Sequence, residues 1–188
     1  GYVLKEYFIN YFTHMSDLTV DLYNNELEIH KKNSEPWKIT LVDTGKDTQT
    51  GGRLKRVKEY LKGDYEFCFT YGDGLADIDL GKLIDFHRFH GKLATITAVS
   101  PPSRYGALEL DGNKVKSFKE KPEGGLINGG YFVLSPKIFD LIDGDMTSWE
   151  GTPLSQLAKT DELRAFIHNG FWQPMDTLRE KNLLQQLW

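Results

Sequence analysis

The chain has 188 residues, a formal net charge of −4 and a single cysteine, Cys68. This length suits one globular domain with its own core, and a negative net charge argues against a broad nucleic-acid-binding face. A lone cysteine forms no disulfide within the chain, which fits a reducing compartment, and no apolar run is long enough to cross a membrane. We therefore expect one cytoplasmic domain over residues 1–188 that binds neither nucleic acid nor a membrane.

The spacing of apolar residues predicts helices and strands that alternate along the chain. Helices are expected over 3–14, 54–61, 80–90, 136–141 and 153–158, and from 177 onward. Strands are expected over 37–42, 66–71, 93–99, 131–134 and 163–167, with an extended stretch over 171–175. An irregular or hairpin-like excursion is expected over the polar segment 15–36, and a hairpin is expected over 107–118. This alternation indicates an α/β fold, in which a mixed, mainly parallel sheet is flanked by helices.

Both ends of the sequence lie inside helical patterns. Residue 1 is Gly, helical spacing is already present at Val3, and Leu184 to Trp188 end the chain within another periodic stretch. We therefore expect the sequence to be part of a longer protein.

Ligands of open α/β sheets bind beyond the carboxyl ends of the strands, so candidate site residues are sought there. The strand expected at 66–71 ends at Gly72-Asp73-Gly74, a carboxylate between two glycines. The glycines allow a ligand to approach the backbone, and carboxylate oxygen is a ligand that Mg²⁺ prefers. A plain turn explains the same residues, because Asp-Gly is common in turns.

A second carboxylate, Asp176, precedes the last expected helix. It is a candidate N-cap of that helix. It is also a candidate partner of Asp73, because two carboxylates from separate strand ends can share one cation that bridges phosphate oxygens.

Three further segments have the composition of a binding site. The run from Asp43 to Arg53 combines Thr hydroxyls, glycines and an Arg at a helix start, which suits an anion or simply a capped helix. The run Lys119-Glu120-Lys121-Pro122 ends a strand, and suits phosphate and sugar hydroxyls or a solvated hairpin edge. The run Asn128-Gly129-Gly130-Tyr131 suits a close ligand approach or a β-bulge.

Two other features are interpreted as structural. His87 and His90 lie three residues apart on an expected helix, and without a third ligand nearby they indicate a solvated helix face. Cys68, in the middle of an apolar strand, is expected in the core.

Taken together, the motifs resemble those of the sugar-1-phosphate nucleotidyltransferase family, and they occur in that family's order. They are Tyr71-Gly72-Asp73-Gly74, Phe118-Lys119-Glu120-Lys121-Pro122, Asn128-Gly129-Gly130-Tyr131-Phe132-Val133 and Phe171-Trp172-Gln173-Pro174-Met175-Asp176-Thr177. The stretches 11–17 and 41–53 resemble the cytidylyltransferase branch. The resemblance covers essentially the whole chain and implies a Rossmann-like nucleotide-diphospho-sugar transferase fold.

The resemblance also implies a reaction and a set of roles. Glucose 1-phosphate would attack the α-phosphorus of CTP, giving CDP-glucose and pyrophosphate for nucleotide-sugar and lipopolysaccharide (O-antigen) biosynthesis, with Mg²⁺ as cofactor and a homo-oligomer as the expected assembly. Asp73 and Asp176 are the expected catalytic carboxylates that bind Mg²⁺. The expected nucleotide contacts are Thr48, Arg53 and Gly72, and the expected sugar-phosphate contacts are Glu120, Lys121 and Asn128.

One departure from the family pattern concerns the N-terminus. The family begins with a strand and a Gly-x-Gly-Thr-Arg loop followed by a Lys, and neither motif occurs in this sequence. We expect an N-terminal βα unit and a short C-terminal tail to lie outside it. Residues 1–188 alone are then expected to be inactive, because losing such charge-stabilising groups typically costs orders of magnitude in rate.

Other functions fit parts of the sequence. A non-catalytic homologue would keep the sugar-phosphate and metal residues, and a thymidylyl or uridylyl transferase would differ only in the base. A glycosyltransferase of the related fold would carry Asp-x-Asp at a strand end. The only such pair, Asp77-Ile78-Asp79, comes later and is expected to lead into a helix.

Overall fold

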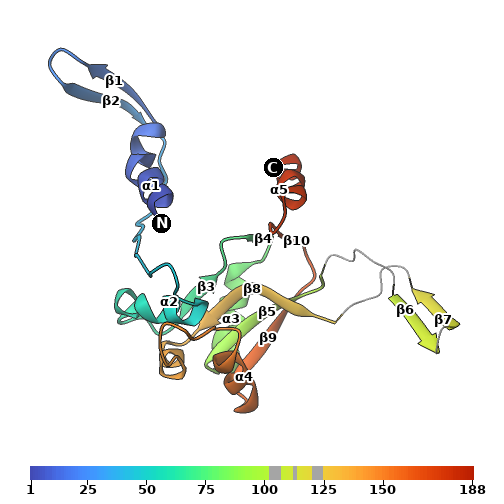
Figure 1. Ribbon diagram of the computed structural model, residues 1–188. Coiled ribbons are helices and arrows are strands. Elements are labelled where there is room, and N and C mark those ends of the chain that lie inside the picture. Colours follow the sequence, from blue (N-terminus) through green and yellow to red (C-terminus); the bar gives the residue numbers. More distant parts are fainter. Residues whose placement is uncertain (102–106, 112–113, 120–124) are drawn as a thin grey trace. The chain divides into compact units, whose positions relative to one another are not determined.

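A computed structural model describes residues 1–101, 107–111, 114–119 and 125–188 (Figure 1). Its contacts divide the chain into two compact units, Gly1–Gly45 and Lys46–Trp188. The prediction that residues 1–188 make one nucleotidyltransferase domain stays a prediction. In the described part of the chain, no helix combines the length and the apolar character that a membrane span requires.

The first unit consists of helix α1 (Tyr2–His14) and a hairpin of β1 (Ser16–Asp21) and β2 (Glu26–Lys32). Asn25 takes a left-handed conformation in the hairpin turn, with φ of 57°. The Asp21 carboxylate holds the turn by accepting the backbone N–H of Tyr23 and Asn24 at 2.9 and 3.0 Å. The predicted helix and the hairpin-like excursion are both confirmed.

The strand predicted at 37–42 is wrong, because this segment is not paired with any described strand. Its Trp37 ring instead stacks on Tyr11, with ring centroids 6.3 Å apart, and remains 63% exposed. A strand exists only through ladder bonds to a neighbour, so apolar composition alone does not form one.

The second unit is built on a four-stranded sheet with the order β3 (Phe67–Thr70), β8 (Ile127–Leu134), β5 (Ala94–Val99) and β9 (Leu163–His168). β5 and β9 are parallel, and β8 runs antiparallel to both β3 and β5. Three of the four strands therefore share one direction, as the predicted mixed, mainly parallel sheet requires.

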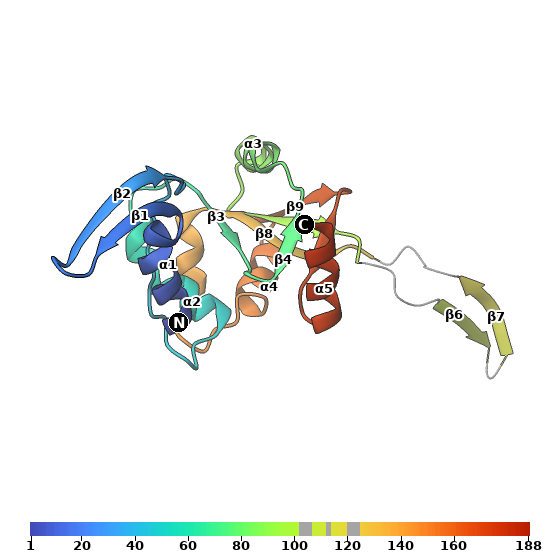
Figure 2. The ribbon, with the colours of Figure 1, turned by 90° about the horizontal axis from the view of Figure 1, so that it is seen from above.

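Helices cover both faces of this sheet. α3 (Leu80–His90) and α4 (Thr152–Lys159) both contact β9, and Figure 2 shows them on opposite sides of the sheet. The remaining elements are α2 (Thr50–Arg56), η1 (Lys58–Leu61), β4 (Gly74–Ala76), β6 (Ala107–Asp111), β7 (Lys114–Lys119), η2 (Pro136–Leu141), β10 (Trp172–Pro174) and α5 (Leu178–Leu187). β6 and β7 form the second predicted hairpin, and their turn residues 112–113 lie outside the described part.

The core of the second unit lies between the sheet and α2, η2 and α4. Trp149 is fully buried there, and its ring meets Phe69 and Phe132 edge-on at 6.4 and 6.0 Å. Phe67 stacks on Phe139 with ring centroids 5.6 Å apart. Large rings that meet in this way bury much area and hold the strand leading to Asp73 in place.

Strand alternation also explains one wrong prediction. Cys68, expected in the core, has an exposed side chain. Its neighbour Phe67 is buried and Phe69 packs against the core, so the side chain of the residue between them points to the opposite face of the strand.

Helix α2 begins in close contact with the loop 145–149. The Gly52 N–H donates to the Thr147 carbonyl at 3.1 Å, and a Cβ at Gly52 would lie 2.6 Å from the Asp145 Cα. A Cβ at Gly51 would lie 2.7 Å from the Thr147 oxygen. The paired glycines are therefore needed because backbone packs directly on backbone.

The face of α3 that carries His87 is buried, which contradicts the predicted solvated histidine face. His87 is 5% exposed, and one hydroxyl, that of Thr95, lies 2.8 Å from His87 Nδ1 and 2.7 Å from His90 Nε2. The Lys92 N–H donates to His90 Nδ1 at 2.9 Å, so His90 is protonated on Nε2 and donates to Thr95. The Thr95 hydrogen is then available for His87 Nδ1, and burial, which lowers the pKa of both rings, favours this neutral arrangement.

We predict that Gly52→Ala destabilises the protein by about 1–3 kcal/mol, because the added methyl group overlaps the loop backbone. Chemical denaturation followed by tryptophan fluorescence, to which the buried Trp149 contributes, measures this loss. Gly144→Ala is the matched control, since a Cβ at Gly144 meets no atom within 4 Å. Equal midpoints for the two variants would contradict the packing argument.

We also predict that the free energy of unfolding falls as the pH drops below about 6.5, the ordinary pKa of histidine. Burial lowers the pKa of His87, with Arg88 acting in the same direction and Glu66 opposing it. Burial and the neighbours His87, Arg164 and Lys92 lower the pKa of His90, and Glu162 opposes them. Because the unfolded chain then binds more protons than the folded chain, the stability present above that pH is lost as the pH falls.

Denaturation series from pH 7.5 to pH 5 measure this dependence. The Oδ1 of an asparagine at position 87 can take the hydrogen bond that His87 Nδ1 accepts, and it has no proton to gain. His87→Asn should therefore show a shallower decline than the natural protein. Identical slopes would contradict the role assigned to His87.

Candidate active site

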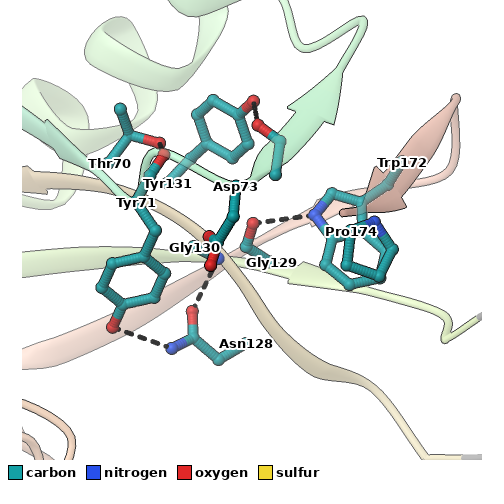
Figure 3. Close-up of a pocket in the computed structure, with 10 residues that line it drawn as sticks. Thr70, Tyr71, Asp73, Asn128, Gly129, Gly130, Tyr131, Trp172 and Pro174 are labelled. Atoms are coloured by element: carbon teal, nitrogen blue, oxygen red, sulfur yellow. Dashed lines mark hydrogen bonds between the residues drawn. The ribbon is translucent and has the colours of Figure 1, made fainter. Parts of the chain in front are cut away.

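A small pocket lies where the ends of several strands meet (Figure 3). Its volume is about 50 Å³, enough for an ion and a few waters but only part of a substrate site. It is lined by Thr70, Tyr71, Asp73, Gly74, Asn128, Gly129, Gly130, Tyr131, Trp172 and Pro174. The pocket therefore brings together two of the predicted site residues, Asp73 and Asn128.

The short ladder between β4 and β10 brings the two predicted metal carboxylates onto neighbouring chain segments. Pro174 is paired with Gly74, and the Met175 N–H donates to the Asp73 carbonyl at 2.7 Å. Asp176 is the next residue, so its backbone lies directly beside the Gly72-Asp73 segment. Both side chains are exposed and open to a ligand.

The N-cap interpretation of Asp176 is wrong, because Thr177 caps α5. The Thr177 hydroxyl accepts the Glu180 N–H at 3.3 Å, and the Glu180 carboxylate accepts the Thr177 N–H at 2.8 Å. This capping box satisfies the start of the helix without Asp176. The carboxylate of Asp176 therefore does not cap α5.

Two hydrogen bonds fix this ladder to β8. The Trp172 indole N–H donates to the Gly129 carbonyl at 2.8 Å, and the Tyr131 hydroxyl donates to the Gly74 carbonyl at 2.8 Å. β8 is irregular at this point, since its register against β5 shifts around the two glycines, as the bulge interpretation predicted. Gly130 has a φ of 79°, and a Cβ there would lie 2.8 Å from the Tyr71 ring.

Tyr71 and Glu150 are site residues that the sequence analysis did not identify. The Tyr71 hydroxyl donates to the Glu150 carboxylate, which also accepts the hydroxyls of Thr50 and Ser148 at 2.6 and 2.7 Å. Burial alone would raise the pKa of Glu150, but these hydroxyl donors bring that pKa below its ordinary value. Burial and the hydrogen bond to Glu150 raise the pKa of Tyr71, so the phenol stays protonated.

Two of the three predicted nucleotide contacts, Thr48 and Arg53, lie on a different part of the unit, around the start of α2. Thr48 is buried just before α2, and the Arg53 guanidinium donates to the Lys46 carbonyl at 3.0 Å. Gly72 lies beside Asp73, and a Cβ there would meet no atom within 4 Å. The Gly52 N–H at the start of α2 is already bound to the loop 145–149, so this N–H is not available to an anion, and no side chain caps the helix there.

The predicted sugar-phosphate contacts are only partly described. Asn128 lines the pocket. Glu120 and Lys121 lie outside the described residues. Their roles, like those of the other predicted site residues, stay predictions.

The Asp-x-Asp pair has structural partners. The Asp79 side chain accepts the Lys82 N–H at 3.0 Å and caps α3, and Asp77 lies 3.0 Å from His168 Nε2. This confirms that the pair leads into a helix. It also disfavours the glycosyltransferase hypothesis, which needs both carboxylates free at a strand end.

The chemistry of Asp73 and Asp176 fits Mg²⁺. Both provide hard oxygen donors, and Mg²⁺ is usually held by one or two carboxylates together with substrate phosphates and water. Among the described residues there is no group of three or more His, Cys, Asp or Glu side chains that could hold a metal by itself. A pair of carboxylates completed by a phosphate is therefore the arrangement to expect.

Fold and site together define a nucleotide-handling α/β enzyme, and the chain belongs to the nucleotidyl transferase family, whose model matches residues 10–177. It is 60% identical over 190 residues to the glucose-1-phosphate cytidylyltransferase of Salmonella typhi, covering 100% of this chain and 74% of that protein. A probable glucose-1-phosphate cytidylyltransferase of Bacillus subtilis is 44% identical over 187 residues, covering 98% of this chain and 72% of that one.

A solved structure supports the fold. The crystal structure of HddC from Yersinia pseudotuberculosis superposes with a TM-score of 0.55 at 25% identity. The match covers 76% of this chain and 64% of HddC, so the chain spans slightly less than two thirds of that protein. The predicted fold class is confirmed.

We predict that Asp73→Asn, made in the full-length protein, lowers Mg²⁺-dependent turnover by on the order of 10²-fold or more, because the amide removes a charge that would hold the cation at the phosphates. The temperature of unfolding should hardly change, since the side chain is exposed. Asp64→Asn, an exposed carboxylate before the opposite end of β3, is the control and should keep full turnover. Undiminished activity of Asp73→Asn would refute the metal role.

Proposed function

We propose that the protein transfers the cytidylyl group of CTP to glucose 1-phosphate, giving CDP-glucose and pyrophosphate. The observation that carries the proposal is the pairing of β4 with β10, which places Asp73 and Asp176 on adjacent segments beside a pocket that also contains Asn128. The identity of 60% to a protein named for this activity supports the choice of substrates.

The reaction makes one bond and breaks one bond. A phosphate oxygen of glucose 1-phosphate bonds to the α-phosphorus of CTP, and the bond from that phosphorus to the oxygen bridging to the β-phosphate breaks. The attacking phosphate is already ionised at neutral pH, so no general base is required. The task of the chain is to align two anions and to offset their charge.

Roles for the chain's residues follow from that task. Asp73 and Asp176 hold Mg²⁺, which would neutralise charge on the phosphates when bound. Asn128 donates an amide N–H to the sugar phosphate, with Glu120 and Lys121 as further contacts. Thr48, Arg53 and Gly72 contact the nucleotide.

A homo-oligomer in the cytoplasm belongs to the same proposal. Helix α1 has no buried residue, and its Tyr2, Val3 and Ile9 are 77%, 74% and 76% exposed. Apolar side chains in such number suit a contact with a second copy of the chain. A single monomeric species in sedimentation velocity at all concentrations would contradict this part of the proposal.

Two alternatives are separated from the proposal by simple measurements. A non-catalytic homologue would bind glucose 1-phosphate without turnover. A thymidylyl or uridylyl transferase would turn over with a different nucleotide. Release of pyrophosphate, rather than transfer of a sugar to an acceptor, distinguishes all nucleotidyl transfer from glycosyl transfer.

We predict that, with the full-length protein, pyrophosphate release in the presence of glucose 1-phosphate is at least roughly tenfold faster with CTP than with UTP or dTTP, because the groups that distinguish the bases differ by a hydrogen-bond donor or acceptor. A coupled phosphate assay with equal concentrations of each nucleotide measures the ratio. Comparable rates with all three would remove the cytidylyl assignment while leaving nucleotidyl transfer in place.

A further inference from the structure

The two oxygens of the Glu150 carboxylate are used differently. Thr50 and Ser148 donate their hydroxyls to the same oxygen, Oε2, at 2.6 and 2.7 Å. The other oxygen, Oε1, accepts the hydroxyl of Tyr71. An ionised carboxylate only accepts hydrogen bonds, so each of the three hydroxyls has to donate to Glu150.

Glu150 is held firmly in this position by its surroundings. It follows Trp149, which is fully buried, and the Trp149 backbone N–H donates to the Thr50 hydroxyl oxygen at 2.9 Å. The Thr50 hydroxyl therefore donates its hydrogen to Glu150 and accepts the Trp149 N–H with one of its lone pairs. The carboxylate is fixed from one side by the start of α2 and by the loop that packs on it.

The direction of the Tyr71 O–H bond determines which group donates in the contact between Tyr71 and Asn128. Because the Tyr71 hydrogen points to Glu150, its oxygen can accept, and Asn128 Nδ2 approaches it at 3.5 Å (Figure 3). The Asn128 carbonyl Oδ1 accepts the Gly130 N–H at 2.8 Å. Both contacts place the amide with its oxygen towards the backbone of β8 and its NH₂ group towards Tyr71.

We propose that Glu150 is a positioning residue that acts through Tyr71 to keep the Asn128 amide oriented as a hydrogen-bond donor to an oxygen of the sugar phosphate. The amide has two N–H groups, and only one faces Tyr71. Among the described residues none accepts the second N–H, which is left for a phosphate or hydroxyl oxygen. The inference rests on the proposed function, since it assumes that a sugar phosphate binds at Asn128.

Glu150→Gln hardly changes the shape of the side chain, but it replaces the acceptor that faces Tyr71 with a donor. The two hydroxyls at Oε2 keep an acceptor if the glutamine oxygen takes that place, so the glutamine NH₂ faces Tyr71 and donates to it. The Tyr71 hydrogen then has to point elsewhere, and towards Asn128 it meets an N–H. Asn128 can accept the Tyr71 hydrogen only if its amide group rotates by half a turn. That rotation breaks the hydrogen bond from the Gly130 N–H and presents the amide oxygen, an acceptor, to an anionic ligand.

The test measures the affinity for glucose 1-phosphate and for CTP by calorimetry with the full chain. Glu150→Gln should weaken glucose 1-phosphate binding roughly tenfold, the effect of one hydrogen bond to a charged group. CTP affinity should change by less than about twofold, and the unfolding temperature should stay within the range of ordinary surface variants. Ser148→Ala is the matched control: it removes a donor to Oε2 and leaves the Tyr71 contact, so both affinities should be retained.

A double-variant cycle separates positioning from simple structural support. Tyr71→Phe removes the hydroxyl through which Glu150 is proposed to act, so Glu150→Gln should cause no further loss in that background. An additive loss, or an equal loss for both ligands, would overturn the proposal. Tyr71→Phe alone should weaken glucose 1-phosphate binding by a few-fold, and this single variant tests the same chain of contacts if Glu150→Gln fails to fold.

The two proposals fail in different ways. Glucose 1-phosphate binding that is equal in the natural protein and in Glu150→Gln overturns the role of Glu150 and leaves the proposed function intact. A natural protein that binds no glucose 1-phosphate overturns the proposed function and this inference with it.

Discussion

The candidate site depends on the antiparallel pairing of two very short strands, β4 and β10. Their ladder consists of three residue pairs and is extended by the bond from the Met175 N–H to the Asp73 carbonyl. Two residues far apart in the sequence, Asp73 and Asp176, become neighbours only through this pairing. So short a ladder is not stable alone, and the bonds from Trp172 and Tyr131 to the backbones at Gly129 and Gly74 attach it to the sheet.

A second constraint comes from the loop that ends at Glu150. The backbone of this loop packs on α2, where glycines leave room for it. The Glu150 carboxylate accepts hydrogen bonds from hydroxyl groups of α2, of the loop itself and of the residue that follows β3. The segment that carries Thr48 and Arg53 and the pocket with Asn128 are thereby connected through one hydrogen-bond network. Networks of this kind favour one geometry, because each partly satisfied alternative leaves a polar group without a partner.

Sequence reasoning located much of this architecture. Periodicity was sufficient for the long elements, such as α1, α3 and β5, and the rule that ligands bind at strand ends led to Asp73. Sequence reasoning failed where tertiary contacts determine the local structure. β4 contains three residues, too few for a pattern, and β10 lies inside the extended stretch predicted at 171–175 but its partner strand was not predicted. The segment 37–42 has strand composition but no neighbour, and Asp176 looks like a cap although Thr177 has the better geometry.

Glu150 could not be predicted from the sequence for a different reason. Nothing in a Trp-Glu-Gly sequence before a helix indicates that its carboxylate accepts hydrogen bonds from hydroxyl groups of distant residues. His87 likewise reads as a surface residue until Thr95 is seen to share its hydroxyl with two imidazoles. In both cases the signal lies in which groups meet after folding. Polar residues that form specific hydrogen bonds are explained by their partners, and the partners are set by topology.

The exposed side chain of Cys68 has a practical consequence. It is the only thiol in the chain, and it lies on β3, the strand that leads to Tyr71 and Asp73. A maleimide fluorophore or spin label would therefore attach at one position and report on the strand that carries the site. Partial desolvation by its neighbours, together with the negative charge of Glu66, raises the pKa of this thiol, so the conjugation would proceed faster in mildly alkaline buffer than at neutral pH.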